Sequence, residues 1–327
     1  MFRSLHYLNE VYKEQSFSRA AQKLYISQPS LSLTIIKFER EIGIQIFDRS
    51  TTPIQLTAAG KVYMEGIQRI LAIENELEAY LDDYKELKTG SLTLGAPHLF
   101  SSYMLPALIA QFSKHFPMVE IRLVEADFLT LHDMTLNGEI DLLIESNQFD
   151  ETLFQNYQLF REHVLLAVPC SDPVNEQLKD YCLSMEDIRS DLHMDSDRPC
   201  ISLRNFQKHR FLMVKKRYDM HSRAMSLCQK SGFEPQVFMF LDQLMTVYNM
   251  VNQQLGVSFV TDTIVKLSNA GTNVVFYKID DEQTTRYINL THKLNRYVSR
   301  PMSEFIRMMA AISVGGITAV TSQQQWK

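Results

Sequence analysis

Residues 27–37 carry the side chains whose types and spacing best suit recognition of another molecule. Ser27, Gln28 and Ser30 bring hydroxyl and amide groups to the start of a predicted helix, and Ser32 follows within the next turn. Such groups hydrogen-bond to phosphates and to the edges of nucleic-acid bases. These four residues are therefore candidates for contact with DNA.

The outward face of this predicted helix also carries apolar side chains. The predicted buried stripe of this helix is Leu31, Ile35, Phe38 and Ile42. At about 100° per residue, the outward arc holds Pro29, Ser32, Leu33, Ile36 and Lys37. Leu33 and Ile36 suit thymine methyl groups in the major groove. The alternative is that they pack on the neighbouring hairpin or on another molecule.

Two short helices must position this face. Phe17, Ala20, Ala21 and Leu24 recur at helical spacing after a capping Ser16 or Ser18. Ser27 caps a second helix, which has Pro29 in its first turn and ends at Gly43. Two short helices joined by a tight turn are the helix-turn-helix pattern. The run IQIFDRSTTPIQLT then predicts a β-hairpin wing.

A long helix is predicted over residues 61–89. Its seam residues alternate at spacings of three and four, with Glu74 interrupting: Tyr63, Ile67, Ile70, Leu77, Leu81 and Tyr84. This pattern is typical of a coiled coil that pairs two chains. The alternative is one amphipathic helix packed on its own domain.

From residue 90 onward, strand patterns alternate with helix patterns in two successive groups, which predicts an α/β domain with largely parallel sheets. Two such halves imply a cleft between two lobes. The expected organisation is a winged helix-turn-helix domain over 1–60, a linker helix over 61–89 and a two-lobed domain over 90–327. Lobe 1 is expected at about 90–161 and 269–327, and lobe 2 at about 162–268.

A ligand of such a domain lies where strands end at the cleft. The candidates by this criterion are Pro97, His98, Leu99, Phe100, Ser101, Ser102, Phe128, Lys215, Tyr218, Met220 and Thr261. Helix N–H groups near Ser101 and Ser102 favour an anion, and the turn Lys215-Lys216-Arg217 adds positive charge. A small anionic metabolite carrying a carboxylate is therefore expected.

Signatures of catalysis are missing, so we expect neither an enzyme nor a cofactor. The chain has no GxGxxG, no P-loop, no HExxH and no nucleophile elbow. His193, Asp195, Asp197 and Cys200 fit no established metal spacing, so no metal is expected. The four cysteines form no CxxC pair and are expected to be free thiols, with a redox-sensing pair as the alternative.

Composition fits a soluble protein with a basic N-terminal end. Of 327 residues, 45% are hydrophobic and 22% charged, and the formal net charge is -5. Residues 1–61 nevertheless carry eight Lys and Arg against five Asp and Glu. No stretch approaches the roughly 20 apolar residues of a membrane helix, and the N-terminus does not resemble a signal peptide. A cytoplasmic location without a membrane partner is expected.

The stretch SFSRAAQKLYISQPSLSLTIIKFEREIGIQIFDRS, continued by PIQLTAAGKVY, resembles the LysR-type transcriptional regulators. The order LTLGAP, MLPALI, LNGEIDLLI, GFEPQV and QLGVSFV resembles the sensing domain of that family. The resemblance covers nearly the whole chain. It implies a winged-helix DNA-binding domain, a dimer through the linker helix and a domain like periplasmic binding proteins. It also implies a phosphate contact for Arg49, whose alternative is an ordinary solvated arginine.

Three features depart from the family pattern. Leu33 stands where a basic residue often follows Ser32, the wing tip is Thr51-Thr52-Pro53 rather than arginine-rich, and residues 172–199 form a longer segment than usual. The expected function is a homodimeric or homotetrameric regulator that binds an A·T-rich inverted repeat of double-stranded DNA and responds to a small-molecule effector. The alternative is a ligand-independent DNA-binding protein whose α/β domain only oligomerises.

Overall fold

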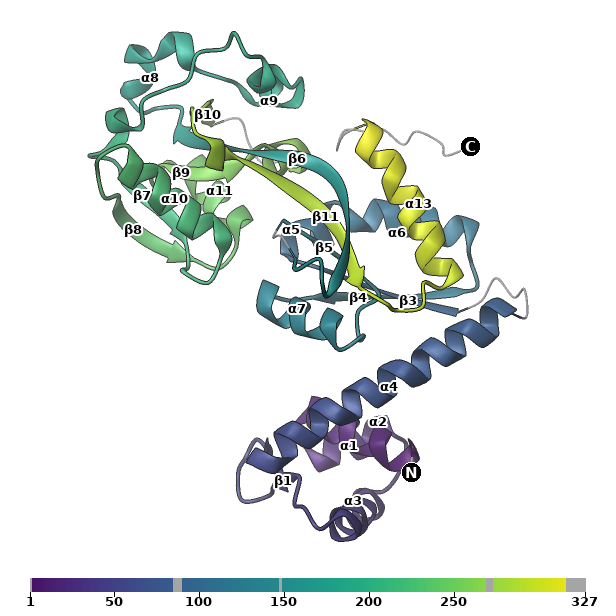
Figure 1. Cartoon of the computed structure of the whole chain (residues 1–327). Coiled ribbons are helices and arrows are strands. Elements are labelled where there is room, and N and C mark those ends of the chain that lie inside the picture. The colour runs from purple at the N-terminus through teal and green to yellow at the C-terminus, as the bar shows by residue number, and fades with distance from the viewer. Residues whose placement is uncertain (1, 85–89, 147–148, 269–272, 316–327) are drawn as a thin grey trace.

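The computed structural model describes residues 2–84, 90–146, 149–268 and 273–315. The N-terminal domain consists of three helices, a short hairpin and the start of a long fourth helix (Figure 1). Their bounds are α1 (Phe2–Glu14), α2 (Phe17–Lys23), α3 (Gln28–Ile42), β1 (Phe47–Asp48), β2 (Gln55–Leu56) and α4 (Ala58–Tyr84). None of the described helices is long and apolar enough to cross a membrane.

Local signals set the two helices of the helix-turn-helix. The Ser16 hydroxyl accepts from the backbone N–H of Arg19 at 3.4 Å, and that of Ser27 accepts from Ser30 at 3.3 Å. Each cap satisfies a backbone donor that has no partner inside its helix. Gly43 ends α3 in the left-handed conformation, with φ of 70°. The predicted helices, their caps and the wing hairpin are confirmed.

Helix α1 was not predicted. Its apolar residues Leu5, Leu8 and Val11 follow one another at intervals of three and are fully or almost fully buried against α2, α3 and α4. This spacing is itself a helical signal.

Helix α4 is buried on one side near its start and carries exposed apolar residues farther along. Met64, Ile67 and Leu71 are buried in the core of the N-terminal domain, and Tyr63 packs against that core. The predicted seam is therefore wrong at Tyr63 and Ile67. The exposed apolar stripe instead runs through Ile70, Ile73, Leu77 and Tyr80, at spacings of three, four and three. The side chains of Leu81 and Tyr84 lie outside the described residues, as do residues 85–89.

The C-terminal domain contains a large mixed sheet, a two-stranded sheet and surrounding helices. The elements are β3 (Gly90–Ala96), α5 (His98–Tyr103), α6 (Leu105–His115), β4 (Val119–Glu125), α7 (Phe128–Leu136), β5 (Leu142–Glu145), β6 (Phe154–Pro169), α8 (Val174–Gln177), α9 (Met185–Arg189), β7 (Arg210–Val214), α10 (Asp219–Lys230), β8 (Gln236–Leu241), α11 (Leu244–Asn252), β9 (Ser258–Thr261), α12 (Asp262–Leu267), β10 (Val274–Tyr277), β11 (Thr285–Lys293) and α13 (Arg300–Gly315).

The large sheet has the order β10-β6-β11-β5-β3-β4, with β9 paired to β6. Only β3 pairs in parallel within it, with β4 and β5, and the separate β7–β8 pair is also parallel. The expectation of largely parallel sheets is therefore wrong. The antiparallel character comes from β6 and β11, which were not predicted as strands.

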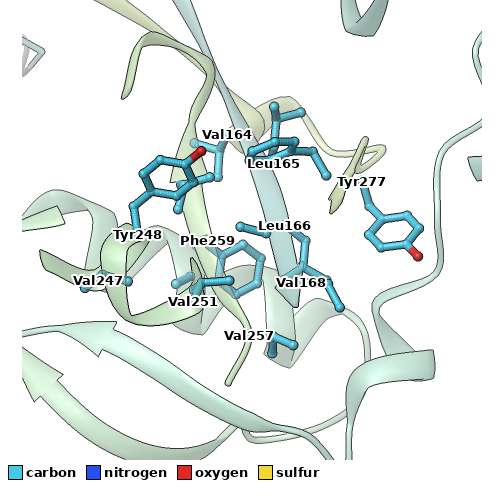
Figure 2. Packing of buried hydrophobic residues seen from close by; sticks show 14 of the residues in the cluster. Val164, Leu165, Leu166, Val168, Val247, Tyr248, Val251, Val257, Phe259 and Tyr277 are labelled. Atoms are coloured by element: carbon cyan, nitrogen blue, oxygen red, sulfur yellow. The ribbon is translucent and has the colours of Figure 1, made fainter. Parts of the chain in front are cut away.

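Strands β6 and β11 run from one lobe into the other (Figure 1). The second half of β6, from Val164 to Val168, packs against α11 and β9 in the lobe 2 core (Figure 2). Val274, Phe276 and Ile279 belong to the same core, because β10 pairs with this half of β6. Placing residues 274–279 in lobe 1 was therefore wrong.

The N-terminal part of the chain touches lobe 1 through α1 and α4. The Asn137 amide donates to Gln68 at 3.2 Å, and Lys13 lies 3.6 Å from Glu139. Gly138, with φ of 78°, lies so close to α4 that an added Cβ would be 2.8 Å from that of Ala72. Farther along, the rings of Tyr80 and Tyr297 meet edge to face at 5.5 Å.

Candidate functional site

The outer face of α3 is open to a partner. Leu33 is 67% exposed, and the neighbouring Gln28, Pro29, Ser30 and Lys37 are exposed as well. Ser32 and Ile36 are half-buried, so Ile36 contributes only part of its surface. An exposed leucine amid polar residues on this helix is suited to an apolar group of a partner, such as a thymine methyl. Ser27 uses its hydroxyl to cap α3.

Arg49 lies beside this face, at the wing, and is held by an acid that was not predicted. Its Nη2 atom is 2.7 Å from Oε2 of Glu39, which is only 8% exposed. The other oxygen of Glu39 accepts from the N–H groups of Ile46 and Phe47 at 2.8 and 3.1 Å. Arg49 also lies over the ring of Phe17 at 5.3 Å. Glu39 thus fixes the wing to α3.

A cavity of about 500 Å³ lies between the two lobes. Seven of the predicted ligand residues line it: Pro97, His98, Leu99, Phe100, Phe128, Tyr218 and Met220. Its remaining walls include Glu145, Lys216, Arg217, Asp219, Asp242 and Arg286. The cavity combines aromatic surface with charged groups from both lobes, as small-molecule sites do.

Four predicted ligand residues do not line this cavity. Ser101 is buried and donates to the carbonyl of Ala96, while Ser102 is exposed and bonds to His98. Thr261 is fully buried, where its hydroxyl caps α12. Lys215 pairs with Asp242 at 2.7 Å. These four residues do follow strand ends, but the direction of their side chains could not be predicted from position alone.

The predicted anion-binding groups are only partly free. Asp242 lies 2.7 Å from both Lys215 and Arg217, and the hydrogen bond from Lys215 holds the pKa of Asp242 below its usual value. Because α5 begins at His98, its unpaired N–H groups belong to His98 and Leu99 rather than to residues near Ser101. Lys216 is exposed and makes no ion pair among the described residues.

A cluster of buried charged groups adjoins the cavity, which was not predicted. Glu145 is 5% exposed, and burial raises the pKa of its carboxyl. Arg286 donates to the fully buried Glu162 at 2.5 Å and lies 3.5 Å from Asp219. These residues come from β5, β6, β11 and α10, so only the folded chain brings them together.

A second cavity, of about 800 Å³, is lined by lobe 2 and the β6–β11 crossing, including His163, His193 and Cys200. His163, His193 and Asp262 could in principle share a metal ion. However, the ammonium of Lys266 lies 3.0 Å from Oδ2 of Asp262, the same oxygen that His193 approaches at 3.0 Å. A metal ion would have to displace this cation, so the group is a poor metal site. All four cysteines are free.

The fold and these two surfaces define a class: a regulator that binds DNA through a winged helix-turn-helix and senses a small molecule in a two-lobed domain. The model of the bacterial regulatory helix-turn-helix protein, lysR family, matches residues 2–61, and that of the LysR substrate binding domain matches residues 85–312. The chain therefore belongs to the LysR family of transcription regulators.

Individual relatives agree. The chain is 28% identical to the uncharacterized HTH-type transcriptional regulator YcgK of Bacillus subtilis, over 93% of this chain and 92% of that protein. A full-length OxyR variant from Pseudomonas aeruginosa has a TM-score of 0.67 at 22% identity, covering 95% and 96% of the two chains. Full-length CbnR, solved in complex with its target DNA, has a TM-score of 0.62 at 17% identity, covering 96% and 99%. These structural likenesses show a shared fold.

Proposed function

We propose that α3 enters the major groove and that Leu33 contacts thymine methyl groups there. Gln28, Pro29, Ser30, Ser32, Ile36 and Lys37 complete the contact surface, with Ser27 at the helix start and Arg49 at the wing. The observation that carries this proposal is the exposure of Leu33 on a helix whose other face is buried. Base-edge and methyl contacts supply sequence specificity, whereas phosphate contacts supply affinity.

We further propose that two chains pair through the exposed stripe of α4, and that a pair or a tetramer reads an inverted, A·T-rich repeat. A two-fold pair of heads requires a two-fold operator. Support comes from four apolar side chains exposed at coiled-coil spacing. The proposed domains are 1–60, 61–89 and 90–327.

The proposed effector is a small molecule bearing a carboxylate, held in the interlobe cavity. Its carboxylate would meet the N–H groups of His98 and Leu99 and the ammonium of Lys216 at the cavity mouth. Because the cavity has walls from both lobes, a ligand there would stabilise one relative position of the lobes. A cavity of about 500 Å³ favours this function over a domain that only oligomerises.

We infer that the protein acts by binding rather than by catalysis, in the cytoplasm where its DNA is accessible. The test is to sequence the DNA fragments that the purified protein selects, with and without a pool of small metabolites. An inverted A·T-rich repeat whose occupancy changes with the pool is expected. Selection of no common sequence would contradict the DNA proposal, and selection unaffected by any pool would favour the ligand-independent alternative.

A further inference from the structure

Glu145 is a buried acid that lines the interlobe cavity without a cationic partner. It ends β5 and is 5% exposed. Its hydrogen bonds come from the N–H and hydroxyl of Ser146, at 2.6 and 2.9 Å, and both end on Oε1. Among the described residues, Oε2 receives no donor and Glu145 forms no ion pair. A carboxylate on so buried a side chain is normally paired, and leaving it unpaired is costly.

The nearby guanidinium group does not remove this excess of negative charge. Arg286 is bound to Glu162 and close to Asp219. Glu162 is itself fully buried, and its Oε1 atom has no hydrogen-bond partner within the described parts of the chain. Asp219 also pairs with Arg223 at 2.6 Å. Three carboxylates thus share two guanidinium groups. Glu145 and Asp219 both line the cavity, and of these two only Glu145 is without a salt bridge among the described residues.

We propose that the effector carries a protonated nitrogen that donates a hydrogen bond to Oε2 of Glu145. This inference rests on the proposed function, since it adds a second group to a ligand whose carboxylate lies at the cavity mouth. The ligand class is then a zwitterion, such as an amino acid or a close derivative. The rings of Phe100, Phe128 and Tyr218 supply apolar surface for the body of the molecule.

The ionisation of Glu145 couples this interaction to pH. Burial raises the pKa of its carboxyl, hydrogen bonds from Ser146 oppose the rise, the positive charge of Arg286 also opposes it, and the charge of Glu162 adds to it. A ligand cation favours the ionised carboxylate. Affinity for the zwitterion should therefore increase as the pH rises through the raised pKa, as long as the ligand nitrogen stays protonated.

The first experiment needs no ligand. Thermal unfolding of the full-length wild type and of the Glu145→Gln and Asp141→Asn variants is followed from about pH 5.5 to about pH 8.5, above the usual range for a carboxyl. Asp141 is a matched buried acid of lobe 1 that pairs with Arg296. Glu145→Gln should melt higher than wild type by an amount that grows with pH, whereas Asp141→Asn should melt lower. A Glu145→Gln variant that melts lower than wild type throughout would overturn the proposal.

The second experiment uses three matched probes: L-phenylalanine, 3-phenylpropionate without the amine, and 2-phenylethylamine without the carboxylate. Binding is measured by calorimetry and by thermal shift. A charged hydrogen bond contributes about 1.5–3 kcal/mol, so the amino acid should bind the wild type at least about tenfold more tightly than 3-phenylpropionate. Glu145→Gln should abolish that preference. A preference for 3-phenylpropionate, or an amine preference that survives Glu145→Gln, would contradict the proposal.

A third variant separates this inference from the proposed function. Ser222 lines the cavity and is exposed, so Ser222→Trp should fill the cavity without disturbing the core. Probes that bind Ser222→Trp as well as wild type lie elsewhere, and the proposed effector cavity then fails. If Ser222→Trp prevents binding but the amine of the probe makes no difference to affinity, the cavity is the binding site and only the role of Glu145 is overturned. If no probe binds, a Glu145→Gln variant that melts no higher than wild type still overturns the proposal, because the carboxylate then carries no unpaired charge for a ligand nitrogen to meet.

Discussion

The guanidinium of Arg49 and the buried carboxylate of Glu39 are 2.7 Å apart, and this contact joins the wing to α3. Replacing Arg49 by alanine leaves that carboxylate without its cation. Because Arg49 is partly exposed, we expect a loss of about 1–2 kcal/mol in the free energy of unfolding, less than for a fully buried pair. Chemical denaturation measures the loss. Arg40→Ala on the exposed side of the same helix is the control, and an equal effect of both variants would contradict the structural role.

Leu33 provides a test of base recognition. Leu33→Ala should weaken binding to the selected operator, and replacing operator thymines by uracil should weaken wild-type binding in the same way, because both changes remove the same methyl contact. The double change should cost little more than either alone. Binding titrations measure all four combinations. Purely additive losses would show that Leu33 does not touch those methyl groups.

Lys37 should act through charge and not through sequence. Lys37→Ala should weaken binding to specific and random DNA alike and lower the salt dependence of binding by about one counterion. Titrations at several salt concentrations give this slope. A loss restricted to the specific operator would instead place Lys37 on a base edge.

If two chains pair through the exposed stripe of α4, a charge placed within that stripe should prevent pairing. Leu77 is 59% exposed in the single chain, and Leu77→Asp would bury a carboxylate if two helices pair, at a cost of several kcal/mol. The variant should lose both the dimer and high-affinity DNA binding. Light scattering measures the mass. Asn75→Asp adds the same charge on another side of α4 and should remain paired; a Leu77→Asp variant that stays dimeric would refute this surface.

The surroundings of Asp262 predict how the stability of the two-lobed domain changes at acidic pH. Burial alone would raise the pKa of its carboxyl, but hydrogen bonds from His163 and His193 and the charge of Lys266 lower that pKa overall. The stability that Asp262 contributes is therefore complete above the unfolded pKa of about 3.9 and is lost as the pH falls below it. Asp262→Asn should cost about 3–5 kcal/mol near neutral pH.

The difference in the free energy of unfolding between wild type and Asp262→Asn should become smaller at acidic pH. Urea unfolding at several pH values measures it, with Asp180→Asn, an exposed acid of the same lobe, as the control. A constant difference down to low pH would mean that Asp262 contributes through packing and not through its charge.

Local patterns predicted the parts of the fold that local interactions determine. The caps at Ser16 and Ser27 and the turn at Gly43 act within a few residues, so α2 and α3 were identified correctly. Strand β6 was missed because Arg161, Glu162 and His163 interrupt its apolar pattern. In the folded chain Glu162 finds Arg286 of β11, a partner far away in the sequence.

The same reasoning explains which predicted residues line the interlobe cavity. His98, Phe128 and Tyr218 do so because topology alone brings strand ends to a cleft. Glu145 and Arg286 depend on which side chains of neighbouring strands face the cavity. The pairing of β5 with β11 determines this, and no local signal announces it.

The attachment of α4 has a mechanical consequence. Every contact described between the N-terminal part of the chain and the two-lobed domain, from Gln68–Asn137 to Tyr80–Tyr297, ends on lobe 1. Lobe 2 joins lobe 1 through β6 and β11. It therefore lies beyond lobe 1 as seen from the N-terminal domain, which is attached to lobe 1 alone among the described contacts. A rotation of lobe 2 about β6 and β11 displaces the outer surface of lobe 2 far more than it displaces the two strands. In a multi-chain assembly, a second copy bound to lobe 2 would be displaced by that larger distance.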